Sequence, residues 1–417
     1  MREPYNSRMS ASIAIPIGIY AWRVRVAPEQ SVSVGRAREP IAAESPVRLL
    51  EAALERPLGL DAPLRRALTP DDRVTVVIDE SLPGIGSLLN TFLGHLTSAH
   101  IDPRNVTLLV ATESAQTWLE ELPDEYGDTK VEVHHADDRD KLAYLATTKA
   151  GRRIYLNRTL VDAEVVAVLS ARRFDPVSGY SGGEAAIFPA LADEESQKAM
   201  AEEYRKEITK DRRIAIRAES TEILGLLGSS FLVQAIEGHG DGIASISVGM
   251  WDSAKAGIES LREFWLAKVE AQADLVIASI SGQSDRIDFR DLAYALSVGK
   301  RALAGHGRLV LLTGAAPVLD EGGELLRKLP TPAVCVKRLA QFKIAEPTAA
   351  SLWAHAANET HLFVKSGWPD EVAEELFATP LHTEGELQRL IDAAERVLIL
   401  PDAHKMRVKI ERSEAAE

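Results

Sequence analysis

Residues 179–191 read Gly-Tyr-Ser-Gly-Gly-Glu-Ala-Ala-Ile-Phe-Pro-Ala-Leu, with three glycines in the first five positions. Glycine has no Cβ, so it reaches positive φ and lets a ligand or a neighbouring segment lie against the main chain. The Glu184-Ala185-Ala186 run that follows favours a helix, whose first N–H groups would form an anion site. A tight strand-to-helix turn without a ligand explains the same spacing equally well.

The size and charge of the chain limit its class. With 417 residues it is long for one hydrophobic core and suggests two or three domains. A net charge of −14 argues against nucleic acid or an anionic membrane as the main partner. No apolar run is long enough to span a membrane, so we expect a cytoplasmic protein. The single cysteine, Cys335, excludes an intrachain disulfide and a cysteine zinc cluster.

Strand and helix patterns alternate along the chain and predict an α/β fold. Residues 73–78 and 165–169 are β-branched runs typical of strands buried on both faces of a parallel sheet. Asp79 directly follows the first run, at the strand end where open α/β sheets bind ligands. We expect one domain over residues 1–253 and a second over residues 254–417, whose last strand could rejoin the first domain.

Several other segments have a predicted structure. Residues 13–20 and 22–26 read as a hairpin, and residues 213–236 and 254–271 show helical periodicity. The apolar run around Cys335 reads as a strand, with an inert core thiol.

His134 and His135 end a predicted strand and form the most metal-like cluster in the sequence. Neighbouring side chains on a strand face opposite ways, so both imidazoles cannot easily bind one ion. We expect one packed and one solvated histidine and no metal site.

Motifs in several of these segments resemble those of the nickel-dependent lactate racemase family. The glycine stretch is similar to the family's Gly-Phe/Tyr-Ser-Gly-Gly loop, and Asp79-Glu-Ser-Leu-Pro is similar to its Asp-x-Thr-Arg-Pro motif. The resemblance covers the chain from about residue 45 to residue 401 and implies two α/β domains, with largely parallel sheets, facing a cleft for cofactor and substrate. It implies these ligand-contacting residues in the cleft: Ser81, Tyr180, Ser181, Gly182, Gly183, Glu184, Gly282 and Asp285.

The residues that would hold the family's cofactor are missing. The family's loop carries a lysine that binds the nickel-pincer nucleotide covalently, and Ala185 stands at that position. The family also supplies a nickel-binding histidine after the loop, but no histidine lies between His135 and His239. We therefore expect neither the pincer nucleotide nor a bound metal.

The family's proton-transferring and cationic positions are also changed. Ala115 and Asp175 stand where the resemblance implies two catalytic histidines, and an alanine cannot transfer a proton. Leu82 and Ala293 stand where cations would contact the substrate. Any remaining catalysis is left to Asp79 and Asp175.

Two functions remain open, a non-racemising protein and a diverged enzyme. The first would bind a small anion, such as a 2-hydroxy acid or a phosphate-bearing molecule, or serve as a partner subunit. The second would be an isomerase or other 2-hydroxy-acid enzyme in which Asp79, Asp175, Glu184 and His135 take new roles with a divalent cation. The number of lost groups favours the first function. A charged Glu184 would oppose a bare anion beside the glycines.

Overall fold

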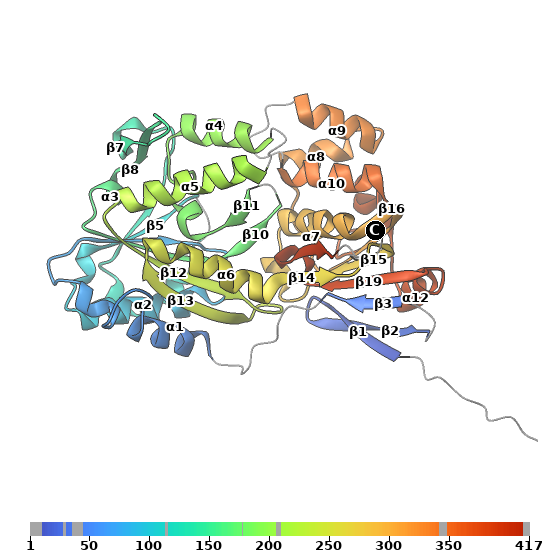
Figure 1. Ribbon diagram of the computed structural model, residues 1–417, viewed down its shortest axis with the longest axis horizontal. Coiled ribbons are helices and arrows are strands. Elements are labelled where there is room, and N and C mark those ends of the chain that lie inside the picture. The colour runs from blue at the N-terminus through green and yellow to red at the C-terminus, as the bar shows by residue number, and fades with distance from the viewer. Residues whose placement is uncertain are drawn as a thin grey trace, which may run out of the picture. The chain divides into compact units, whose positions relative to one another are not determined.

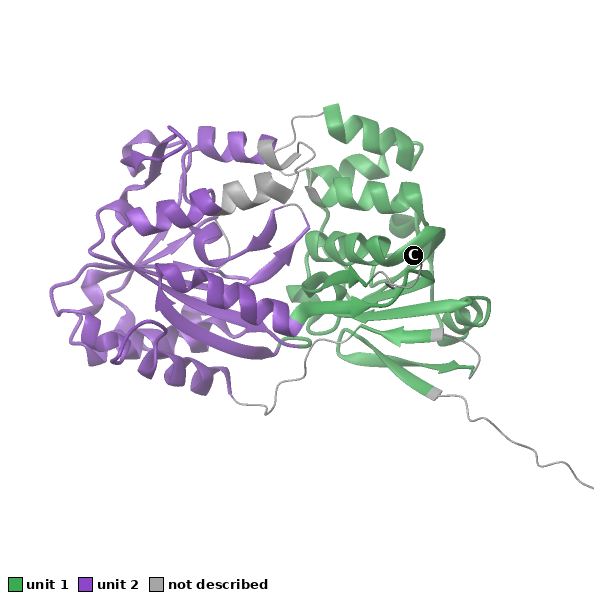
Figure 2. Cartoon of the chain, in the orientation of Figure 1, with its two compact units in different colours: residues 1–38, 239–241, 265–417 green, residues 39–238, 242–264 purple. Residues whose placement is uncertain are grey.

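The computed structural model describes residues 11–27, 31–35, 45–112, 116–176, 178–205, 210–341 and 348–411. It has two compact units (Figure 2). Unit 1 contains residues 1–38, 239–241 and 265–417, and unit 2 contains residues 39–238 and 242–264. Each unit is built on a sheet of mainly parallel strands, which confirms the predicted α/β class.

The sheet of unit 2 has six strands in the order β13-β12-β9-β4-β5-β6. All neighbouring pairs are parallel except β12 and β13, which form an antiparallel hairpin. The strands are β4 (Val74–Ile78), β5 (Val106–Val110), β6 (Lys130–Val133), β9 (Val165–Ala171), β12 (Ser229–Glu237) and β13 (Ile243–Met250).

Helices cover both faces of this sheet (Figure 1). Successive side chains of a strand face opposite sides, so β4 contributes Val76 to one core and Val77 to the other. The first core includes α1 (Pro46–Glu55) and α2 (Ile85–Ser98), and the second includes α4 (Glu194–Arg205) and α5 (Lys210–Leu226). The fully buried apolar strands therefore have the composition expected of a sheet covered on both sides.

Shorter elements complete unit 2. Strands β7 (Leu142–Thr147) and β8 (Arg153–Asn157) form an antiparallel hairpin. The two further helices are α3 (Arg158–Val161) and α6 (Ala254–Trp265). The 3-10 helices are Leu64–Ala67, Pro103–Asn105, Thr117–Glu121, Asp124–Tyr126, Arg139–Lys141 and Trp251–Ser253.

The sheet of unit 1 also has six strands, in the order β18-β17-β16-β15-β19-β3, and all of its pairs are parallel. The strands are β3 (Ser31–Val34), β15 (Ala273–Ser279), β16 (Leu303–Leu312), β17 (His361–Lys365), β18 (Thr379–Pro380) and β19 (Arg396–Pro401). A separate parallel pair joins β14 (Leu266–Val269) to β20 (Arg407–Ile410).

One face of this sheet packs against the hairpin of β1 (Ala11–Ile17) and β2 (Tyr20–Val26), together with α12 (Glu384–Asp392). The predicted N-terminal hairpin is thereby confirmed. α7 (Phe289–Ala302) contacts β15 and β16, and α10 (Thr348–Glu359) packs on α7. The remaining helices are α8 (Glu321–Arg327), α9 (Pro332–Gln341) and α11 (Asp370–Glu375).

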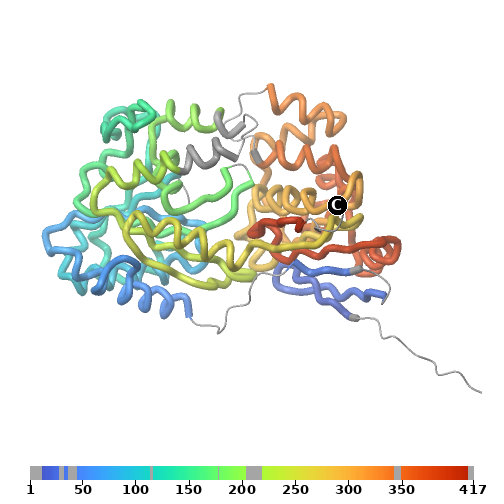
Figure 3. The backbone as a smooth tube through the Cα atoms, in the orientation of Figure 1, coloured from blue at the N-terminus to red at the C-terminus, as the bar shows by residue number. Residues whose placement is uncertain are grey.

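The division of the chain differs from a single boundary after residue 253. The N-terminal β3 pairs with β19, with Val32 opposite Val397, so the beginning of the chain belongs to unit 1 (Figure 3). Residues 239–241, the turn between β12 and β13, also belong to unit 1. The last sheet strand, β19, stays in unit 1 beside β15.

Three expected elements are corrected by the structure. The expected helix over residues 213–236 ends at Leu226, and the buried run after it is β12. The helix expected over residues 254–271 ends at Trp265 and continues as β14. The run around Cys335 is helix α9, although the cysteine is buried as expected. These segments are short and mostly apolar, so their periodicity does not distinguish strand from helix. Among the described residues, no helix is both long and apolar enough to cross a membrane.

Candidate functional site

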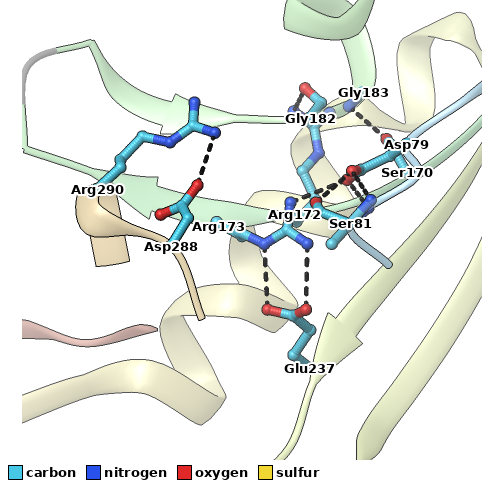
Figure 4. Close-up of polar contacts among 11 residues, drawn as sticks. Asp79, Ser81, Ser170, Arg172, Arg173, Gly182, Gly183, Glu237, Asp288 and Arg290 are labelled. Carbon is cyan, nitrogen blue, oxygen red and sulfur yellow. Dashed lines mark hydrogen bonds and ion pairs between the residues drawn. The ribbon is translucent and has the colours of Figure 1, made fainter. Parts of the chain in front are cut away.

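Three charged side chains of unit 2 meet at the carboxyl ends of three neighbouring parallel strands. Asp79 follows β4, Arg173 lies just beyond β9, and Glu237 is the last residue of β12. Arg173 bonds both carboxylates, as Figure 4 shows. We call these three residues the Arg173 cluster. The carboxyl edge of a parallel sheet is where α/β proteins place ligand groups, so the strand order itself creates this candidate site.

Both carboxylate oxygens of Asp79 are occupied by hydrogen bonds. Oδ1 accepts from the Ser81 amide at 3.1 Å and from the Ser81 hydroxyl at 2.5 Å. Oδ2 accepts from the Ala171 amide at 3.1 Å and from Arg173 Nη1 at 2.8 Å. Asp79 therefore holds the start of the loop after β4 against the end of β9, while it pairs with the arginine.

Arg173 is held by two carboxylates and remains partly exposed. Nε and Nη2 donate to Glu237 at 3.1 Å each, and Nη1 donates to Asp79. Burial disfavours the charged guanidinium, but the charges of Asp79 and Glu237 outweigh it and raise the pKa of Arg173 above its ordinary value. About a quarter of its side chain, 26%, is exposed. Arg173 is thus a permanently charged and partly exposed side chain.

The glycine loop follows directly from this cluster. β10 (Arg173–Asp175) and β11 (Gly179–Ser181) form a short antiparallel hairpin, and Gly183–Ala186 is a single 3-10 turn in place of the expected helix. Gly182 has φ 74° and Gly183 φ 55°, both in the region that favours glycine. A Cβ on Gly182 would overlap the carbonyl oxygen of Ala171. The close neighbour that requires this glycine is therefore the protein's own β9 strand.

The loop amides also bond within the protein. Gly183 N–H donates to Ser170 Oγ at 2.8 Å, and Ala185 N–H donates to the Gly182 carbonyl at 3.2 Å. The predicted anion site would therefore have to do without the amides of Gly183 and Ala185.

Glu184 lies inside unit 2 and pairs with Arg172. Both side chains are buried, with 4% and 0% of their areas exposed. Arg172 also donates to Gln234 Oε1 at 2.7 Å and to the Gly182 carbonyl at 2.9 Å. The negative charge that the sequence placed beside the glycines is thus balanced by a buried cation.

The other candidate residues of the loop differ in their surroundings. Asp175 Oδ1 accepts from the Ser178 amide at 2.5 Å, which closes the turn between β10 and β11. Tyr180 is buried, with its ring centroid 5.5 Å from that of Phe174. Ser181 is partly exposed and lies opposite Arg173 in the ladder. Of these residues, Ser181 is the one placed beside the cation.

Gly282 and Asp285 belong to unit 1, whereas the other candidate residues belong to unit 2. Gly282 follows β15 with φ 100°, and a Cβ there would lie 2.9 Å from Asp241 Oδ1. Asp285 is exposed in the 3-10 helix Ser284–Arg286.

Most of the residues that differ from the family motifs lie in apolar surroundings. Leu82 is buried in the core shared with α1 and α2, and Ala293 is buried on the inner face of α7. Ala185 is partly buried in the 3-10 turn. Ala115 lies outside the described residues.

The two adjacent histidines have the environments predicted for them. His134 is buried and its Nε2 lies 2.9 Å from the Ala192 carbonyl oxygen, whereas His135 is exposed. Burial lowers the pKa of His134 below its ordinary value. Within the described part of the chain, no group of three or more histidine, cysteine, aspartate or glutamate side chains could hold a metal ion.

Sequence reasoning missed Arg172, Arg173 and Glu237. A signal for the first two was present, since paired arginines directly follow the continuous apolar run of β9. Like Asp79, these arginines follow a buried strand at its carboxyl end, so the same pattern marks them as candidate ligand-binding residues. Glu237 carried no such signal, because β12 was expected to be helical.

The fold and this cluster define an α/β protein of two units with charged residues at a parallel-sheet edge. Residues 18–208 match the family model described as lactate racemase N-terminal domain. This match spans 191 of the 417 residues, so the N-terminal part of the chain is similar to the family that the motifs predicted.

Solved structures extend the likeness in fold over nearly the whole chain. A lactate racemase apoprotein from Thermoanaerobacterium thermosaccharolyticum superposes with a TM-score of 0.76 at 17% identity, covering 96% of this chain and 100% of that one. A protein from Thermotoga maritima superposes with a TM-score of 0.62 at 12% identity, covering 90% and 100%. No curated protein matches the chain.

Proposed function

We propose that this lactate racemase-like protein binds a small carboxylate anion at the Arg173 cluster and does not racemise it through a nickel-pincer nucleotide. The observation that carries the proposal is the exposed part of Arg173. A guanidinium has five N–H donors, and its hydrogen bonds to Asp79 and Glu237 use three of them. Two donors remain for a ligand carboxylate, so Arg173 would supply a cation that Leu82 and Ala293 do not.

Electrostatics make the proposed binding weak. Two carboxylates surround one guanidinium, so the Arg173 cluster has a net charge of −1 and repels a free anion. At ~4–6 Å, one uncompensated charge contributes on the order of 1–4 kcal/mol. Glu184 does not add to this repulsion because Arg172 neutralises it.

The residues present do not fit the family's cofactor. Ala185 offers no amine for a covalent bond, and the charged side chain next to it, Glu184, is committed to Arg172. The family's nickel-binding histidine follows the glycine loop, whereas His135, the last histidine before the loop, directly follows β6 and the next histidine in the sequence is His239. We therefore assign no chemical step to a pincer nucleotide in this chain.

A diverged enzyme that uses a divalent cation is less well supported. Of its four suggested residues, Glu184 is paired with Arg172, and Asp79 accepts four hydrogen bonds. Cation ligands need oxygen atoms that converge on one point. Asp175 closes its own turn, so these side chains are used within the protein.

Calorimetry with lactate and malate, in EDTA and in Mg²⁺, tests the proposal. We expect weak binding that does not depend on the metal, is lost in Arg173→Gln, and strengthens about fivefold or more in Glu237→Gln because one negative charge is removed. Arg104→Gln is the control, since that exposed arginine pairs with Asp102, two residues away on the surface. Binding that is unchanged in Arg173→Gln, or absent from both the wild type and Glu237→Gln, would contradict the proposal.

A further inference from the structure

A second group of polar residues lies at the carboxyl edge of the unit 1 sheet. Ser281 follows β15 and Asp402 follows β19, and these two strands are parallel neighbours. The chain leaves β15 to form β16 on one side, whereas β19 lies on the other side of β15. Such a reversal of strand order is the point where open α/β sheets place ligand-binding residues.

Asp402 is the buried centre of this group. None of its side-chain area is exposed, and its backbone has a positive φ of 51°. Oδ1 accepts from the amide and hydroxyl of Ser281, at 2.8 and 2.7 Å. Oδ2 lies 2.7 Å from His239 Nδ1, and the amide of Gly240 donates to it at 3.4 Å. A buried carboxylate is stable only when it is bonded in this way.

The charge of Asp402 is maintained inside the protein. Burial acts to raise the pKa of its carboxyl group, but the hydrogen bond from His239 and the charge of Lys405 outweigh burial and lower the pKa below its ordinary range. Lys405 also donates to the Gly240 carbonyl at 2.6 Å, which fixes the turn that carries His239.

The carboxylate orients the imidazole of His239. Because Nδ1 faces an ionised oxygen, the neutral ring carries its proton on Nδ1 and leaves Nε2 as a proton acceptor. The ring edge packs against buried Trp265, with centroids 5.2 Å apart, and 39% of the histidine side chain is exposed. A partly exposed base oriented by a buried carboxylate is the arrangement used in general-base catalysis.

Ser281 is not a nucleophile in this group. Its hydroxyl donates to Asp402 Oδ1, so serine and histidine bind the same carboxylate rather than each other. The proton acceptor would therefore act on a water molecule. The carboxylates of Asp402 and Asp241 are matched by the charges of Lys405 and Arg286, so the group offers no unpaired charge to an ionic substrate and suits an uncharged one.

We propose that His239, positioned by Asp402, is a general base that activates water to hydrolyse small uncharged acyl esters at a second site in unit 1. One O–H bond of water breaks and its proton moves to Nε2, while the water oxygen bonds to the acyl carbon. The ester C–O bond then breaks, and the leaving oxygen takes the proton from the imidazolium. The products are a carboxylic acid and an alcohol.

Hydrolysis of p-nitrophenyl acetate by the full chain tests this proposal. Wild-type protein is expected to exceed an equal concentration of free imidazole, and His239→Gln is expected to lose about 10²-fold or more of that rate. His355→Gln is the matched control, because His355 is an exposed histidine that also contacts a carboxylate, that of Glu359, at 3.1 Å. A wild-type rate no higher than that of imidazole, or equal losses in both variants, would overturn the proposal.

The positioning role of Asp402 requires a readout other than rate. In wild-type protein labelled with ¹⁵N-histidine, we expect the neutral His239 ring to be protonated on Nδ1, and Asp402→Asn to shift protons towards Nε2. Ser281→Ala removes a neighbouring bond without touching the ring and should preserve the tautomer. An Nε2-protonated wild-type ring would contradict the proposal even if Asp402→Asn fails to fold.

Discussion

Two buried side chains, Glu184 and Arg172, balance each other's charge beside the glycine loop. Glu184 looks like an obstacle to anions in the sequence, yet it is the partner of buried Arg172. Arg172 in turn bonds Gln234 and the Gly182 carbonyl, so one guanidinium joins β12 to the loop. Removing one member of a buried ion pair leaves the other charge without compensation, and this costs far more than the loss of a surface pair.

Glu184→Gln is therefore expected to affect stability rather than anion binding. The amide cannot balance Arg172, so the free energy of unfolding should fall by about 3 kcal/mol, towards the range measured for broken buried pairs. Glu194→Gln is the matched control, because Glu194 pairs with Lys198 on the surface and should change stability by less than about 1 kcal/mol. Urea denaturation of both variants measures the difference, and equal effects would show that the pair at Glu184 contributes no more than a surface pair.

At the scale of elements, the hairpin of β10 and β11 and the turn after it depend on glycine for two separable reasons. Gly179 has φ 93° but open space around its Cβ position. Gly182 combines φ 74° with a Cβ position that would overlap the Ala171 carbonyl. Backbone strain acts at both positions, and steric overlap with β9 acts at Gly182.

Alanine substitutions at these two glycines separate the two effects. Gly179→Ala should lose about 1–2 kcal/mol of stability, which is the cost of placing a non-glycine residue at positive φ. Gly182→Ala should lose a further 1–3 kcal/mol or so, because β9 has to move to admit the methyl group. Thermal unfolding followed by circular dichroism compares the variants. Equal melting temperatures would mean that the loop shifts away from β9 without cost.

Elements differ in how far the sequence reveals them. The β-branched runs of β4 and β9 predict buried parallel strands, and Asp79 at the end of β4 was recognised from that pattern. β12 was missed because a strand buried along almost its whole length lacks the alternation of apolar and polar residues that would distinguish it from a buried helix. Because β12 was not predicted as a strand, Glu237 could not be placed at a sheet edge, and the second partner of Arg173 was not predicted.

At the scale of the whole molecule, the pairing of distant segments is the part that the sequence does not reveal. β3 lies beside β19 although more than 350 residues separate Val32 from Val397. The His239–Asp402 pair likewise joins residues 163 positions apart. Local patterns give the type of an element but not its neighbour in a sheet, so the family resemblance predicted the α/β architecture while the division into units required the structure.

We propose that the whole protein carries no covalently bound pincer cofactor. After expression together with a cofactor-producing pathway, the intact mass of the protein should equal that of its sequence, because Ala185 has no amine. No interconversion of L- and D-lactate should be measurable by chiral chromatography. With Ala115 and Asp175 at the two base positions, each lost base removes roughly 10²–10⁴-fold in rate.

A lactate racemase expressed with the same pathway is the positive control for mass and activity. Ala185→Lys is the informative variant, because it restores an amine in the 3-10 turn while Leu82 and Ala293 stay apolar. We expect this variant to remain inactive even if it gains an adduct, since a tether alone supplies neither a base nor a cation. A mass increase on the wild-type protein, or lactate racemisation by it, would show that other residues of this fold have taken over the cofactor.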